Sequence, residues 1–110
     1  EENNLQYALD RLFDLRKTLK SMIQVNKNVG LNGVKTFVLE IMELRNKLLL
    51  APCPQPENFL LCEEYRTAVQ KLSGQVDELA LCLSRNQPEK ISLIVNGLLE
   101  LVNLAYSLAL

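Results

Sequence analysis

The sequence predicts an all-α protein, an up-down-up-down antiparallel four-helix bundle. Apolar residues recur at the three- and four-residue spacing of helices along the whole chain, and the alternating pattern of strands is missing. Three breaks rich in Gly, Pro, Asn and Ser divide this pattern into four segments of similar length, and short connections place successive helices antiparallel. We expect one domain over residues 1–110, cut from a larger protein, because 110 residues build one core and the chain starts without Met.

The first helix is expected over residues 4–25, with Asn3 or Asn4 as its N-cap. Its core face consists of Leu5, Ala8, Leu9, Leu12, Leu15, Leu19, Met22 and Ile23. The stretch NKNVGLNG, residues 26–33, predicts a break. The second helix is then expected over residues 33–50, with the apolar seam Val34, Phe37, Val38, Ile41, Leu44 and Leu48.

The stretch APCPQPE, residues 51–57, ends the second helix, because three prolines in five residues cannot continue it. The third helix is expected over residues 58–84, where Gly74 predicts a kink or a close contact between helices. In the last break Asn86 and Glu89 resemble a capping box, and Pro88 suits a first helical turn. The fourth helix fills the remainder of the chain.

The fourth segment carries more apolar surface than one core needs. Its polar residues lie within about 80° of the helix circumference, which leaves an apolar arc of about 240°. That polar stripe consists of Ser92, Asn96, Glu100, Asn103 and Ser107, and it argues against a membrane span. Three explanations remain: deep burial, cover by other parts of the parent protein, or a groove or self-association surface.

Composition excludes several classes of function. A net charge of −1 gives no reason to expect nucleic acid or an anionic membrane as partner. The chain has no His and no Gly-rich phosphate loop, so we expect no enzyme, no cofactor and no metal site. The three cysteines, Cys53, Cys62 and Cys82, form no metal-binding spacing; we expect free thiols, with Cys62 and Cys82 in the core, and a cytoplasmic location.

Basic residues beside apolar positions suggest a binding groove. Basic and apolar residues share one side of the helix near Phe13 in the first segment and near Leu39 and Met42 in the second. An apolar centre with a basic rim suits an amphipathic helix that carries carboxylates, although Arg and Lys stems also pack along apolar surfaces while their charges reach water. The candidate partner-binding residues are Phe13, Arg16, Lys17, Lys20, Lys35, Leu39, Met42, Arg45, Leu93, Leu101 and Leu104. Within this set the three leucines of the fourth segment form the floor and the basic residues form the rim.

Residues 37–84 also resemble the first helices of focal-adhesion-targeting domains, as in focal adhesion kinase. The similar features are a Leu/Glu-rich helix, a proline-bearing break and a long helix that ends in KLSGQVDEL, residues 71–79. Relative to that family the chain has an additional helix in front and lacks one behind. The resemblance implies binding of acidic, leucine-rich LD motifs of paxillin-type adaptors in basic-rimmed grooves between helix pairs, without assigning individual groove residues here.

The sequence therefore predicts a non-catalytic interaction module of a cytoplasmic adaptor or signalling protein, whose partner is an acidic amphipathic helix. The alternative is a homodimerisation or intramolecular docking domain that uses the surplus apolar face of the last helix.

Overall fold

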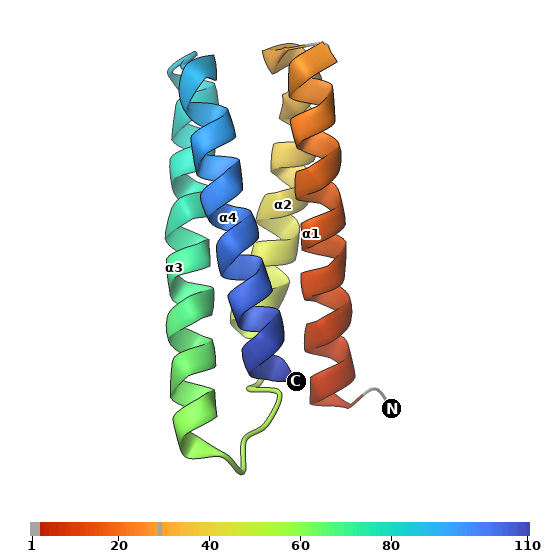
Figure 1. Ribbon diagram of the computed structural model, residues 1–110, viewed down its shortest axis with the longest axis vertical. Helices are drawn as coiled ribbons and strands as arrows, with labels where there is room; N and C mark the ends of the chain where they lie inside the picture. The colour runs from red at the N-terminus through yellow and green to blue at the C-terminus, as the bar shows by residue number, and fades with distance from the viewer. Residues whose placement is uncertain (1–2, 29) are drawn as a thin grey trace.

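The computed structural model describes residues 3–28 and 30–110 and confirms the antiparallel four-helix bundle. Its helices are α1 (Asn4–Asn28), α2 (Leu31–Leu50), α3 (Phe59–Ser84) and α4 (Pro88–Ala109). Figure 1 shows the α1–α2 and α3–α4 turns at one end of the bundle and the α2–α3 connection at the other. Each helix packs against two neighbours: α1 and α3 both contact α2 and α4. The bundle measures 44 × 24 × 19 Å.

The predicted break between the first two helices is much shorter than expected. Asn3 caps α1 as predicted, since its Oδ1 accepts a hydrogen bond of 2.7 Å from the backbone N–H of Gln6. However, α1 continues to Asn28 and α2 already begins at Leu31. Gly30 makes this tight reversal, because its φ of 87° and ψ of −161° lie in a region that is nearly restricted to glycine.

The α2–α3 connection begins and ends close to where the sequence predicts. Ala51, which precedes Pro52, has extended backbone angles and ends α2. Asn58 caps α3 by accepting a hydrogen bond of 3.2 Å from the N–H of Leu61. At Gly74 the expectation of a close contact is wrong: an added Cβ would meet nothing within 4 Å. Helix α3 runs through this position without interruption (Figure 1).

The expected capping box before the last helix is also wrong. Asn86 has a φ of 56° and belongs to the end of α3, not to the start of α4. The N–H of Asn86 donates to the carbonyl of Leu83, and the N–H of Gln87 donates to that of Cys82 over 3.0 Å, as in a Schellman-type ending. Asparagine is one of the few residues that accept this left-handed conformation. Pro88 occupies the first turn of α4 as predicted.

The core contains most of the predicted apolar positions of the first two helices, and Leu5, Leu9, Ile23 and Phe37 are partly buried against it. Its largest fully buried side chains include Leu12, Leu15, Leu19, Met22, Ile41, Leu72, Leu79, Ile91 and Leu98. Cys62 and Cys82 are buried in it as predicted, and so is Cys53 from the α2–α3 connection. The same connection is tied to the end of α4, because Gln55 Nε2 donates a hydrogen bond of 2.8 Å to the Ala109 carbonyl.

Candidate functional site

The predicted binding residues of α1 adjoin α4. The Arg16 guanidinium carbon lies 5.5 Å from the centre of the Phe13 ring and 5.8 Å from that of Tyr106, so one cation faces two rings from neighbouring helices. Phe13 is 49% exposed. Lys20 is exposed and lies one turn beyond Arg16 on the same side of α1. We call Phe13, Arg16, Lys20 and Tyr106 the α1–α4 patch.

Lys17 belongs to a different part of the surface. With Asp14, Thr18 and Ser21 it lines a hollow of about 280 Å³ whose other wall is α2. Thr18 Oγ1 donates to the Asp14 carbonyl at 2.9 Å and to Glu40 of α2 at 3.3 Å. Lys17 therefore lies on the α2 side of α1, outside the α1–α4 patch.

The candidates on α2 face away from that patch. Arg45 is only 8% exposed and is directed at α3. Its Nη1 donates to the Ser73 carbonyl at 3.1 Å, to Ser73 Oγ at 3.2 Å and to Asp77 Oδ1 at 2.8 Å. The expectation of Arg45 as an open rim residue is thus wrong, because its charge is already paired inside the α2–α3 interface. Lys35 and Leu39 are exposed and Met42 is half-buried.

The candidates on α4 lie on its α3 side. Leu101 and Leu104, with Leu108, form the apolar wall of a hollow of about 340 Å³. The α3 wall of this hollow carries both charge signs and consists of Glu63, Glu64, Thr67, Ala68 and Lys71. We call this surface, with Leu93 beyond the hollow on the same flank of α4, the α3–α4 face.

The exposure of the α4 leucines decides between some of the explanations for the surplus apolar arc of this helix. Leu93 is 75% exposed and Leu104 is 49% exposed, so deep burial is wrong as the explanation for these side chains. Only 28% of the residues in the most apolar stretch of α4 are buried. By length and composition α4 is the one helix among the described residues that could cross a membrane, a test that core helices also pass.

The predicted floor and rim consequently do not surround one groove. Because α1 and α3 each lie between α2 and α4, the α1–α4 and α2–α3 interfaces are on opposite sides of the bundle. The predicted residues instead belong to separate surfaces: the α1–α4 patch, the α1–α2 hollow with Lys17, the α2 surface and the α3–α4 face.

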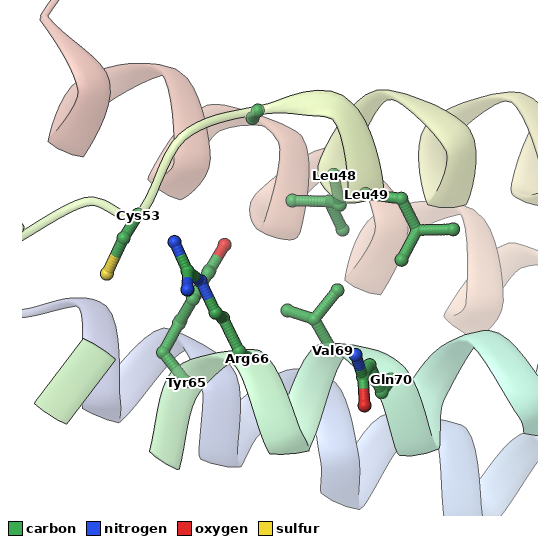
Figure 2. Close-up of a pocket in the computed structure, with 8 residues that line it drawn as sticks. Leu48, Leu49, Cys53, Tyr65, Arg66, Val69 and Gln70 are labelled. Carbon is green, nitrogen blue, oxygen red and sulfur yellow. The ribbon is translucent and has the colours of Figure 1, made fainter. Parts of the chain in front are cut away.

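A third feature, absent from the sequence-based candidates, is a cavity at the corner where α2 leads into α3. Its volume is about 320 Å³, and its lining consists of Leu48, Leu49, Ala51, Cys53, Tyr65, Arg66, Val69 and Gln70. In Figure 2, Tyr65 and Arg66 point from α3 toward the connection, Cys53 points back toward α3, and Leu48 and Leu49 lie above Val69. None of these residues was predicted as a site residue, because the cavity exists only where α2, α3 and their connection meet.

The pKa values of Tyr65, in the lining of this corner cavity, and of Cys62, a neighbour of Cys53, are raised, so both groups keep their protons at neutral pH. Burial, followed by the proximity of Cys53, raises the pKa of Tyr65 to about 12. The neighbouring Cys53 side chain is the main cause that raises the pKa of Cys62, followed by burial. The cavity lining thus combines the un-ionised phenol of Tyr65 with the Arg66 cation.

Within the described ranges, no group of three or more Cys, Asp or Glu side chains is arranged to hold a metal ion. Comparison with protein-family models, with curated proteins and with solved structures gives no match.

Proposed function

We propose that this domain is a non-catalytic protein-interaction module of a cytoplasmic adaptor or signalling protein, and that its α1–α4 patch binds an acidic amphipathic helix. The single observation that carries the proposal is the stacking of the Arg16 guanidinium against both Phe13 and Tyr106.

The patch combines the two features that such a partner needs. Half of the Phe13 ring is available for apolar side chains of a partner helix. The two rings contact the face of the Arg16 guanidinium and leave its edge free to bind carboxylates. Because the side chain is already held in place, binding costs less side-chain entropy. Lys20, one turn further along, extends the positive charge parallel to the α1 axis.

The test is a titration of the ¹⁵N-labelled domain with an LD-motif peptide, the ligand that the resemblance to focal-adhesion-targeting domains suggests. We expect saturable amide shifts on the facing sides of α1 and α4. Phe13→Ala should weaken binding by about tenfold, as is usual for an aromatic anchor. Lys20→Glu should weaken it less, by a few-fold, and should reduce its salt dependence.

The matched control is Leu104→Glu, which adds a charge on the other flank of α4. We expect it to leave peptide affinity unchanged. Equal affinity for wild type and Phe13→Ala would refute the proposal, and so would shifts that map to the α3–α4 face.

A second candidate function, self-association, is favoured by the α3–α4 face. Leu93 and Leu104 are exposed, Leu101 and Leu108 are half-buried, and its hollow carries Glu63 and Glu64 together with Lys71. In a two-fold symmetric dimer the same surface meets itself, so Lys71 of one copy can lie opposite a glutamate of the other. A face with charges of both signs is compatible with this arrangement.

Sedimentation equilibrium over a wide concentration range tests this second function. A mass that rises with concentration, and that returns to the monomer value in Leu104→Glu but not in Lys20→Glu, would support it. A monomer at every concentration would exclude it and leave the α1–α4 patch as the proposed interaction site.

A further inference from the structure

The Tyr65 hydroxyl is the least explained polar group of the corner cavity. Tyr65 is 4% exposed, and its Oη has no hydrogen-bond partner among the residues that the structure describes. Buried hydroxyls are nearly always paired, since leaving one unpaired is unfavourable. The Tyr65 side chain lines the cavity, so its unpaired donor is suited to an acceptor that enters there.

The remaining lining defines what could enter. Arg66 lines the same cavity as Tyr65, and both side chains point from α3 toward the connection (Figure 2). The only ion pair of Arg66 among the described residues, with Glu63, is long at 3.9 Å and solvent-exposed. Such a pair is weak, so the guanidinium can turn toward a ligand. On the other side of the cavity, Leu48, Leu49 and Val69 form an apolar wall.

Size restricts the ligand further. At roughly 30 Å³ for each non-hydrogen atom, the share that a water molecule takes in the liquid, 320 Å³ accommodates about ten such atoms. An anionic head group at Tyr65 and Arg66 and a short aliphatic chain along the leucines fill this space. A carboxylate fits the head position best, because its two oxygens match one hydroxyl donor and one guanidinium fork.

We propose that the corner cavity binds a carboxylate with a short aliphatic chain, in which Tyr65 donates a hydrogen bond to one oxygen, Arg66 pairs with the other, and Leu48, Leu49 and Val69 enclose the chain. The raised pKa of Tyr65 supports this arrangement, since the phenol keeps its proton at neutral pH and remains a donor. The site is separate from the α1–α4 patch and meets the α3–α4 face only through the Arg66–Glu63 ion pair.

Octanoate, with ten non-hydrogen atoms, is the probe. Titration of the ¹⁵N-labelled protein under reducing conditions should give saturable shifts confined to the α2–α3 connection and the first half of α3. 1-Octanol should bind at least tenfold more weakly, because it lacks the charge that Arg66 pairs with. Tyr65→Phe should lower octanoate affinity by about tenfold or more, the usual effect of removing a hydrogen bond to a charged group. Arg66→Gln should lower it by several-fold.

The stability of the variants separates binding from folding. Because the hydroxyl has no protein partner, Tyr65→Phe should melt at a temperature no lower than that of wild type. Leu49→Phe alters an exposed wall residue without touching the donors and should reduce binding by filling the cavity. Leu104→Glu, on the α3–α4 face, should bind octanoate normally.

Three results would overturn the proposal: no saturable shifts at the cavity, equal affinity of wild type and Tyr65→Phe, or equal affinity for octanoate and 1-octanol. Tighter binding of octyl phosphate than of octanoate would also contradict it, because the class of head group would be wrong. If Tyr65→Phe proves unstable, its hydroxyl has a protein partner after all, and the premise fails.

Discussion

At the scale of single residues, Arg45 shows how a charge is accommodated in the core of this bundle. Its aliphatic stem lies between α2 and α3, while its head group reaches Ser73 and Asp77. Nε donates to Asn46 Oδ1 at 2.8 Å, which leaves few of its donors unpaired. Asp77 itself is largely in water, with a side-chain exposure of 66%. The pair is therefore half-buried, and its contribution to stability depends on packing as well as on charge.

We expect two substitutions of Arg45 to differ. Arg45→Ala removes the stem and should cost about 2–3 kcal/mol in the free energy of unfolding. Arg45→Met keeps most of the stem volume and removes the charge, so its cost should stay within about 1 kcal/mol. Urea denaturation of both variants, with Asp77→Asn as the matched partner variant at about 1 kcal/mol, measures this difference. Equal losses for Ala and Met would show that the polar contacts, and not the stem, supply the stability.

Tyr65 makes a pH-dependent contribution to stability. Its pKa is about 12 in the folded protein and close to 10 when unfolded. Between these values the folded state binds more protons than the unfolded state, so stability falls as pH rises above 10 and the loss is complete near 12. Below pH 10 both states are protonated and no effect is expected. The full loss corresponds to about 3 kcal/mol at 1.36 kcal/mol for each pKa unit.

Denaturation between pH 8 and pH 12 under reducing conditions tests this contribution. The free energy of unfolding should decline less steeply in Tyr65→Phe than in wild type, and the difference between the two curves isolates Tyr65 from lysines and other tyrosines. Parallel curves would mean that the phenol ionises in the folded protein as easily as in water.

At the scale of helices, the glycines at two positions have opposite roles. Gly30 needs its positive φ to reverse the chain between α1 and α2, whereas Gly74 lies in the interior of α3 with open space around it. Gly30→Ala should therefore destabilise the protein by about 1–3 kcal/mol through backbone strain. Gly74→Ala should stabilise it by about 0.5–1 kcal/mol through a lower entropy of the unfolded chain. Thermal melts of the two variants should shift in opposite directions, and a shift of the same sign would contradict the assignment.

The helices were predictable because their signals are local. The three- and four-residue periodicity, the Asn3 cap and Pro88 all act within one or two turns, and each of these predictions is confirmed. The two helix ends that were predicted wrongly depend on backbone angles. The polar, Gly-rich composition of residues 26–33 predicted a long break, but the positive φ of Gly30 allows a short one. The left-handed backbone of Asn86 ends α3, whereas Asn86 was predicted to start α4.

At the scale of the whole molecule, the candidate site was only partly predictable, because it depends on which flanks meet. A helical wheel places Arg16 and Arg45 beside their seams, but not beside a particular neighbour. Which flank of α1 faces α4 is set by the handedness of the bundle, which periodicity does not determine. In the structure Arg16 meets Tyr106 of α4, whereas Arg45 meets Ser73 of α3. The corner cavity could not be inferred either, since it needs α2, α3 and their connection in one place.

The arrangement of α4 leads to a last prediction, that its two flanks act independently. Tyr106 belongs to the α1–α4 patch and Leu104 to the α3–α4 face, and residues two apart on a helix point about 200° away from each other. Effects at separate sites without shared partners usually add within about 0.5 kcal/mol. The affinity for an acidic peptide should therefore agree within about twofold at protein concentrations below and above any self-association, and Leu104→Glu should not alter it. Calorimetric titration at both concentrations measures this. A peptide affinity that changes several-fold with self-association would show that α4 couples its two flanks, and the two surfaces would then have to be treated as one site.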